Sequence, residues 1–464
     1  MTPSGAARRP RPRSGATPAR RCALRVLRRV FAEGAFADRA LRAEADRARL
    51  EGRDRALAER IAFGAVQRRA TLDHVLAACS ARPLAAIDPQ LLDALRIGVL
   101  QLLFLDAVPD RAAVEQTVEL AREVAGERTT GFANAVMRRA AREGPGLLGG
   151  LDDATPEGAA VRHSHPEWIA RLWWDVLGPA GARALLAHDN EPPELAVRVN
   201  ELVATRGEVL AALRRGGASA RPDAALPEAL AVDGPFDLPR SPLFAAGAIT
   251  PQARASMLVA RVVAPRAGER VLDLCAAPGT KTSHLAALMG GRGTLAAVEL
   301  HPGRAGALAE NCRRLRAELV EIVSGDARHV DVGEGYDRIL LDPPCSDLGT
   351  LAARPDARWR KSPADVHELA ELGRELLVAA ARRVRPGGTV TFSTCTISPP
   401  ENAEQIEGFL ATRSDFAADD LGAEWPDLRD RSWPRYLQTL PHRHETAGFF
   451  IARLRRTGWT APPS

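Results

Sequence analysis

Apolar residues recur at helical spacing through the first third of the chain. Leu24, Leu27 and Phe31 begin the pattern, and similar stripes follow them. Residues three and four positions apart share one face of a helix, so the spacing predicts a bundle of amphipathic helices from Cys22 to about Glu143. The segment GPGLLGG at 144–150 follows, and its turn-forming residues predict an interruption of the helices and a domain boundary.

The pattern becomes mixed between His163 and about Leu243. A helix-like run covers 168–186, and the short apolar strand AVRVN covers 196–200. Proline-rich connections separate these elements, so we expect a small α/β connecting domain here.

After Gly247 short apolar strands alternate with amphipathic helices, which predicts a parallel sheet covered on both faces. Ligands of such a sheet bind beyond the carboxyl ends of its strands, where the strand order reverses. The predicted strands are 270–275, 294–300, 320–326, 336–344, 389–395 and 448–454, and the predicted helices begin near Lys281, Gly303, Pro363 and Glu401.

The chain has 464 residues, more than one hydrophobic core usually serves, and this length predicts several domains. We expect a disordered tail at 1–20, an all-α domain at 21–145, the small α/β domain at 150–243 and an α/β Rossmann-like domain at 244–457. The tail lacks acidic residues, which also fits an organellar transit peptide, but its prolines oppose the amphipathic helix that such a peptide needs.

Composition and charge fit a soluble protein without identifying its partner. Hydrophobic residues make up 45% and charged residues 26% of the chain, and we find no apolar run of the ~18 residues that cross a bilayer. The formal charge is +5, carried almost wholly by Arg, since Lys281 and Lys361 are the only lysines. This charge permits nucleic-acid binding, but a genome rich in G and C would enrich Arg equally well.

Six cysteines are scattered without any C-x-x-C pair, so neither a disulfide framework nor a zinc site is expected. A reduced, cytoplasmic setting follows. The side chains of Cys275 and Cys312 are interpreted as small buried hydrophobes. Cys345 and Cys395 differ because both follow strands at the ligand-binding edge, and a helix start soon after Cys395 would favour its thiolate.

The segment DLCAAPGTKT at 273–282 follows the first large-domain strand and opens a helix. Its small residues would let a nucleotide-like cofactor approach the backbone, although a merely tight turn is an alternative. Glu299 ends the next strand about twenty residues later, where it could accept the ribose hydroxyls of an adenosine. Asp326 ends the third strand and could accept an adenine amine, or simply cap a helix.

Two further motifs end later strands. In LDPPCSDLGT the prolines hold Asp342 and Cys345 in extended, rigid backbone, and STCTISPPENAEQI brings Cys395 to the same edge. Such rigid placement suits a catalytic site.

Together AAPG-K-T, DPPCS, STCT and ENAEQI resemble the Sun-type RNA cytosine-C5 methyltransferases over about 244–455. RDRALAERIAFGAVQRRATLDHVL and GFANAVMRR resemble the RNA-binding NusB fold, and this combination is similar to the RsmB/Sun family, which acts on 16S rRNA. Thr280, Ala253 and Ala447 depart from the family pattern, and none is a supposed catalytic residue.

The resemblance implies S-adenosyl-L-methionine as cofactor and a covalent mechanism. Cys395 would add to C6 of the cytosine, Asp342 would hydrogen-bond the base near N3, and Cys345 would help to release the adduct. The target cytosine would lie in single-stranded or looped 16S rRNA, and we expect a monomer. The implied cofactor contacts are Cys275, Ala276, Ala277, Pro278, Gly279, Thr280, Lys281, Glu299, Asp326 and Asp342.

Three alternatives remain open. Another RNA, such as tRNA, could be the substrate. A DNA cytosine-C5 methyltransferase would use Cys345 as nucleophile, although STCT and the helical domain oppose this reading. A non-catalytic RNA-binding assembly factor would need none of these motifs, yet all are present. The sequence does not identify the target cytosine.

Overall fold

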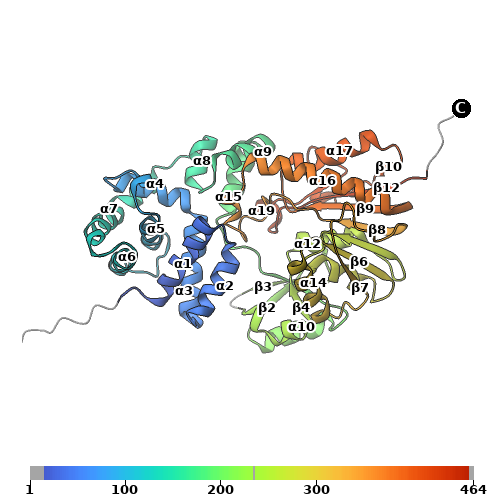
Figure 1. Ribbon diagram of the computed structural model, residues 1–464, viewed down its shortest axis with the longest axis horizontal. Coiled ribbons are helices and arrows are strands. Elements are labelled where there is room, and N and C mark those ends of the chain that lie inside the picture. Colours follow the sequence, from blue (N-terminus) through green and yellow to red (C-terminus); the bar gives the residue numbers. More distant parts are fainter. Residues whose placement is uncertain (1–14, 234–235, 459–464) are drawn as a thin grey trace, which may run out of the picture. The chain divides into compact units, whose positions relative to one another are not determined.

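The computed structural model describes residues 15–233 and 236–458 (Figure 1). Contacts divide the chain into two compact units. Unit 1 comprises Met1–Asn190 and Arg354–Arg360, and unit 2 comprises Glu191–Ala353 and Lys361–Ser464.

Unit 1 is helical, as the periodicity predicts. Leu24 and Leu27 of its first helix are buried in a core that the other helices share. Its α-helices are α1 (Pro18–Glu33), α2 (Ala37–Arg47), α3 (Gly52–Gln67), α4 (Arg69–Cys79), α5 (Pro89–Phe104), α6 (Asp110–Ala125), α7 (Thr130–Gly149), α8 (Pro156–Arg162), α9 (Glu167–His188) and α15 (Ala357–Arg360). The first of them begins inside the segment expected to be a tail, while residues 1–14 lie outside the described residues.

The predicted interruption at 144–150 is wrong, because α7 continues to Gly149 with Pro145 inside it. Packing explains the difference. A side chain at Gly144 would meet Leu103 at about 3.0 Å, and Leu147 and Leu148 pack against the helical core. Tertiary contacts therefore outweigh the weak helix propensity of this segment.

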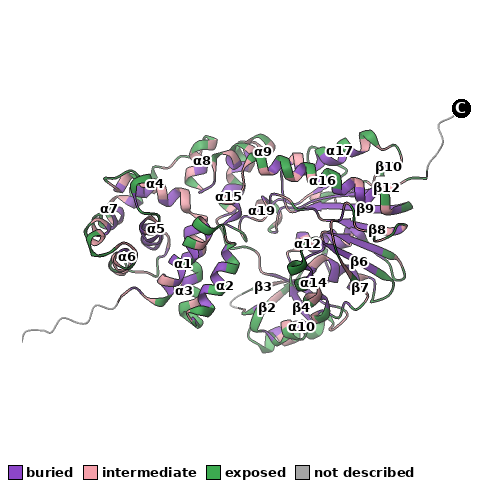
Figure 2. Ribbon diagram, viewed as in Figure 1, coloured by how far each residue is buried: buried purple, intermediate pink, exposed green. Residues whose placement is uncertain are grey.

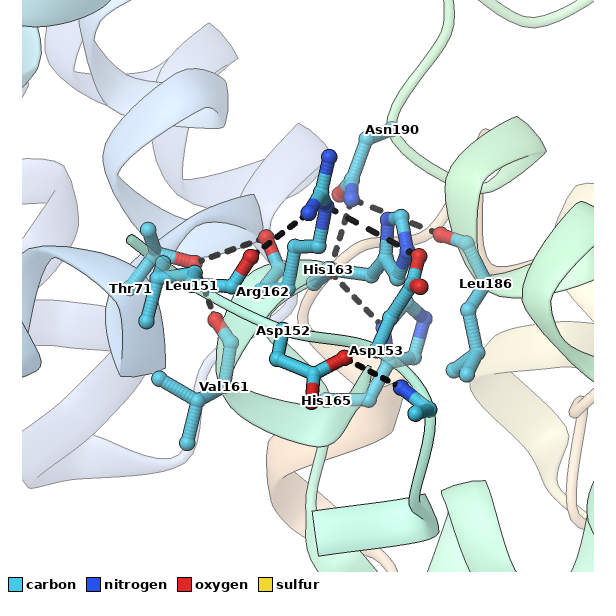
Figure 3. Close-up of polar contacts among 11 residues, drawn as sticks. Thr71, Leu151, Asp152, Asp153, Val161, Arg162, His163, His165, Leu186 and Asn190 are labelled. Atoms are coloured by element: carbon cyan, nitrogen blue, oxygen red, sulfur yellow. Dashed lines mark hydrogen bonds and ion pairs between the residues drawn. The ribbon is translucent and has the colours of Figure 1, made fainter. Parts of the chain in front are cut away.

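The side chains of Thr71 in α4 and Asn190, which follows α9, hold the segment after α7 within unit 1 (Figure 3). Thr71 Oγ1 donates to the Val161 carbonyl at 2.6 Å, and Asn190 Nδ2 donates to the His163 carbonyl at 2.6 Å. The ring of His163 lies 3.1 Å from a carboxylate oxygen of Asp153. Contacts thus group α8 and α9 with the helices before them, and the domain boundary expected at 150 stays a prediction.

Unit 2 begins with a small antiparallel sheet in the order β2-β3-β1-β4. The strand expected at 196–200 is confirmed as β1 (Ala196–Val199). The other elements are α10 (Arg206–Arg215), β2 (Ser219–Pro222), β3 (Ala229–Asp233), α11 (Pro242–Ala245) and β4 (Ile249–Pro251).

The larger sheet has the order β10-β12-β9-β8-β5-β6-β7, with β11 paired to β12. All six predicted strands are present. The strands are β5 (Arg270–Leu274), β6 (Thr294–Glu299), β7 (Val320–Ser324), β8 (Tyr336–Leu341), β9 (Val384–Thr394), β10 (Phe416–Ala418), β11 (Leu437–Gln438) and β12 (Phe450–Arg456). The helices are α12 (Arg254–Val263), α13 (Thr280–Leu288), α14 (Pro302–Arg314), α16 (Pro363–Arg383), α17 (Ala403–Thr412), α18 (Leu421–Glu424) and α19 (Pro441–His444).

Helices cover both faces of this sheet, as the continuous apolar strands predict. Val271 and Leu340 pack with α12, α13 and α14 on one face, whereas Leu272 and Leu341 pack with α16 and α17 on the other. Figure 2 shows the central strands buried between outer helix surfaces that are exposed.

The sheet is mixed rather than parallel, which corrects the prediction. β5, β6, β7, β8 and β9 run parallel, but β12 is antiparallel to β9 and β10 is antiparallel to β12. The order reverses between β5 and β8, so a ligand site is expected where these two strands end. Among the described residues, no helix is long and apolar enough to cross a membrane.

Candidate active site

The loop from Cys275 to Gly279 turns sharply between β5 and α13. Gly279 has φ +94°, and a side chain there would meet Leu308 at 2.6 Å, so only glycine fits without strain. Asn311 Nδ2 donates to the Pro278 carbonyl at 2.8 Å, and Arg304 Nη2 donates to the Ala277 carbonyl at 2.8 Å. Both contacts hold the loop from outside and leave small residues at the end of β5.

Glu299 ends β6 beside this loop and is 2% exposed. One of its oxygens accepts the His301 backbone N–H at 3.0 Å, and the other lies 3.7 Å from Arg304 Nη2. That second distance is too long for a good hydrogen bond. The carboxylate therefore keeps capacity to accept hydrogen bonds, which fits the ribose hydroxyls expected from the sequence.

Asp326 follows β7, as expected, but its carboxylate is engaged locally. It accepts the Arg328 backbone N–H at 2.9 Å and the Arg328 guanidinium at 2.6 Å. These bonds to Arg328 lower the pKa of Asp326 to about 2. Contact with an adenine amine would compete with this ion pair. A turn rather than a helix follows Asp326, so its carboxylate stabilises that local turn instead of capping a helix, and the adenine contact stays a prediction.

Asp342 and Lys281 join the ends of β8 and the start of α13. Lys281 Nζ lies 2.7 Å from Asp342 Oδ2, while Ser393 Oγ of β9 donates to Asp342 Oδ1 at 3.1 Å. Burial opposes the charge of Lys281, but the Asp342 carboxylate outweighs burial and holds the pKa of Lys281 above its ordinary value. Contacts from two other elements, α13 and β9, thus fix the orientation of this carboxylate.

The structure brings Cys345 and Cys395 together at the same edge. Their sulfur atoms are 3.3 Å apart, and both side chains are partly exposed. The Gly349 N–H donates to the Cys395 carbonyl at 2.9 Å, which ties the two cysteine loops together. A side chain at Gly349 would overlap the Gly448 carbonyl, so this loop junction needs glycine.

The expected stabilisation of a Cys395 thiolate is not found. Contact with the Cys345 thiol, then burial, then the carboxylates of Asp347 and Asp342 raise the pKa of Cys395 well above its ordinary value. The short helical turn Pro399–Glu401 (η4) follows, and α17 begins only at Ala403. The nucleophile candidate therefore rests as a thiol and needs a proton acceptor to react.

Two acidic side chains that contact the candidate site were not singled out from the sequence. Asp347 accepts a hydrogen bond from Cys395 Sγ at 3.0 Å. Glu401 is 3% exposed and accepts the Ser346 backbone N–H at 2.7 Å and the Ser346 hydroxyl at 2.6 Å, and so clamps the two loops. Both acids stand within the quoted motifs, CSD and PPEN, and that position was the available signal.

The other four cysteines are not part of the Cys345–Cys395 contact, and all six cysteines are free. Cys312 is buried, in agreement with its interpretation as a small hydrophobe, whereas Cys275 is only partly buried. Burial raises the pKa of Cys312 to about 11 and that of Cys275 further.

A mixed sheet of this order, with small residues and an acid at successive strand ends, is a Rossmann-like arrangement that binds ligands at the carboxyl ends of its parallel strands. Family models match three regions: the 16S rRNA methyltransferase RsmB/F at 260–455, the NusB family at 17–142 and an RsmF/B-like ferredoxin-like domain at 165–239.

Whole-chain relatives agree with these matches. The probable ribosomal RNA small subunit methyltransferase B of Synechocystis is 34% identical over 94% of this chain and 99% of its own length. The putative methyltransferase Rv1407 of Mycobacterium tuberculosis is 40% identical over 98% of this chain and 100% of its own length. The chain therefore belongs to the RsmB/F family of RNA methyltransferases.

A solved structure also has a similar fold. The crystal structure of PH0851 matches with a TM-score of 0.79 and 26% identity, covering 96% of this chain and 100% of that one.

Proposed function

We propose that the chain methylates carbon 5 of a cytosine in 16S rRNA, with S-adenosyl-L-methionine as methyl donor and Cys395 as nucleophile. The observation that carries this proposal is the meeting of two thiols, 3.3 Å apart, beside the Asp342–Lys281 pair at the switch point of the sheet. Cytosine C5 is a weak nucleophile, and a thiol adding at C6 makes it reactive.

The residues near β5 and β6 fit the cofactor. Ala276, Ala277 and Gly279 carry no bulky side chain that would keep a ligand away from the loop backbone, and the buried Glu299 carboxylate keeps an acceptor for hydroxyl groups. Cys275, Pro278, Thr280 and Lys281 complete the loop, with Asp342 near it. When bound, the cofactor supplies an electrophilic methyl group.

The chain's own residues perform the remaining work. Asp342, oriented by Lys281 and Ser393, hydrogen-bonds the base near N3, where electron density moves as sulfur adds to C6. Cys345 helps to release the enzyme from the covalent adduct. The NusB-like helices hold surrounding RNA by shape and phosphate, and the base leaves its stack to react. A cytoplasmic, monomeric enzyme is part of the same proposal.

The test is transfer of labelled methyl groups to 16S rRNA transcribed in vitro, compared with tRNA and with DNA. Native protein should place the label at C5 of cytosine, and Cys395→Ala should abolish it. Cys345→Ala should instead accumulate a protein–RNA adduct that survives denaturing electrophoresis. An adduct lost in Cys345→Ala but kept in Cys395→Ala would assign the nucleophile to Cys345, and label only in tRNA would reject the rRNA assignment.

A further inference from the structure

We propose that Asp347 is the base that takes the proton of Cys395 when this thiol attacks the cytosine, an inference that rests on the proposed function. Asp347 Oδ1 is the acceptor of the hydrogen bond that Cys395 Sγ donates at 3.0 Å. The proton therefore already points at a carboxylate oxygen in the resting protein, and a base within this distance needs no movement to accept it.

The backbone conformation of Asp347 is one that glycine adopts more readily, so the presence of a carboxylate here is consistent with a role for that side chain. Its φ is +63°, in the left-handed region, which costs most residues other than glycine roughly 1 kcal/mol or more and which Asp tolerates better than most. Glycine would relieve that strain. Thr350 N–H donates to the Asp347 carbonyl at 3.0 Å, so the turn itself is fixed by backbone contacts that do not need the carboxylate.

Among the charged and titratable groups around Cys395, Asp347 is the one placed to accept its proton. Cys345, from the loop after β8, offers a thiol rather than a base. Asp342, at the end of β8, is held by Lys281 of α13 and by Ser393 of β9. Of these groups, Asp347 is the carboxylate that contacts the sulfur of Cys395 directly.

The step balances with the methyl donor of the proposed function and with water. The S–H bond of Cys395 breaks, an O–H bond forms on Asp347, and the freed sulfur pair makes the S–C6 bond while the C5=C6 π pair moves towards C5 and, through C4, towards N3 beside Asp342. The pair at C5 would take the methyl group as its bond to the donor breaks. The C5 proton then leaves to water, assisted by Cys345, the C5=C6 bond reforms and the sulfur pair returns to Cys395. The thiolate then takes its proton back from Asp347.

The experiment compares native protein with Asp347→Asn and Asp347→Gly in two assays. Single-turnover methylation of 16S rRNA should fall by about 10² or more at neutral pH, within the range that a general base contributes. The rate at which iodoacetamide alkylates Cys395, followed by mass spectrometry, should instead increase. Removing a negative charge beside the sulfur stabilises its thiolate, so both variants should react faster and at lower pH than native protein.

Opposite changes in the two assays distinguish a base from a merely structural acid. Methylation by either variant that equals or exceeds the native rate would overturn the proposal, as would an unchanged alkylation profile. The exposed carboxylate of α17 provides the control, because Glu404→Gln removes one charge and should alter neither assay. If native protein methylates no RNA, the proposed function fails, while alkylation still reports whether Asp347 acts on Cys395.

Discussion

Lys281 and Asp342, 61 positions apart in the sequence, meet at 2.7 Å where α13 begins and β8 ends. The contact joins the loop assigned to the cofactor with the carboxylate assigned to the base. Because burial would otherwise lower the pKa of Lys281, the Asp342 carboxylate keeps the Lys281 ammonium charged inside the site.

Replacing Lys281 tests this pair. Lys281→Met leaves the Asp342 carboxylate without the cation that orients it. We therefore expect the rate of methyl transfer to fall by roughly tenfold to a hundredfold, a loss of about 1.4 kcal/mol of transition-state stabilisation for each factor of ten. Single-turnover rates measure the effect. Lys361, the other lysine of the chain, supplies a matched control. Equal losses in Lys361→Met would show that the pair has no special role.

The second prediction concerns a buried arginine that contacts α13, the helix after the cofactor loop. Arg198 of β1 donates from Nη2 to Ser283 Oγ of α13 and from Nε to Gln252, each at 2.8 Å, and burial lowers its pKa to about 9. Lysine cannot span both partners. Arg198→Lys should therefore raise the KM for S-adenosyl-L-methionine about tenfold and change kcat much less.

The KM for RNA is the internal comparison for this variant. It should stay unchanged, and Arg206→Lys, at the exposed start of α10, should change neither constant. A parallel rise in both KM values in Arg198→Lys would point to general loosening of unit 2 instead.

The sequence best predicts the position of elements whose own apolar pattern is unambiguous, such as strands that are buried on both faces. β5 and β8 are apolar on both faces because helices cover both, so their position follows from the pattern alone. An apolar run has the same appearance in either direction, however, and the antiparallel course of β12 is therefore invisible in it. The helix through Pro145 escaped prediction because distant packing, at Leu103 and the bundle core, stabilises it.

In the candidate site, too, the local sequence pattern predicted some features, whereas others depend on contacts that the pattern does not show. Cys345 and Cys395 could be placed together because both end parallel strands, whose carboxyl ends share one edge. Asp347 could not be assigned, since its role depends on a left-handed backbone turn and a 3.0 Å contact within a loop. The charge state of Cys395 was predicted in the wrong direction because motif spacing places Cys345 nearby but does not show that its thiol and the Asp347 carboxylate contact the sulfur of Cys395 directly.

Arg358 gives a prediction on the stability of unit 1. Its buried guanidinium donates to the carbonyls of Ser164 at 2.9 Å, Asp189 at 3.1 Å and Gln67 at 3.2 Å. Arg358→Ala leaves these acceptors facing a cavity, so we expect the free energy of unfolding to fall by about 3 kcal/mol. Calorimetry should show the loss in the transition of the helical unit, and the exposed Arg111→Ala should show almost none.

A pH-dependent loss of stability is expected around His284. Its ring lies 2.8 Å from Glu228 Oε1 in unit 2, and burial, followed by the charge of Arg198, lowers the pKa of His284 to about 4 from an ordinary value of 6.5. The folded state therefore favours the neutral imidazole. Its contribution is complete above pH 6.5 and is lost as pH falls towards 4, which amounts to about 2 kcal/mol between pH 7 and pH 5.

Hydrogen exchange of the α13 amides, measured by mass spectrometry at pH 7 and pH 5, checks this sign. Burial opposes ionisation of Glu228, but its contacts with His284 and Arg261 hold its pKa below the ordinary value, so its own contribution is lost only below about pH 4.5 and lies outside the window. His284→Gln cannot titrate and should lose less protection between the two pH values than native protein does. The same loss in both proteins would assign the acid sensitivity to groups other than His284.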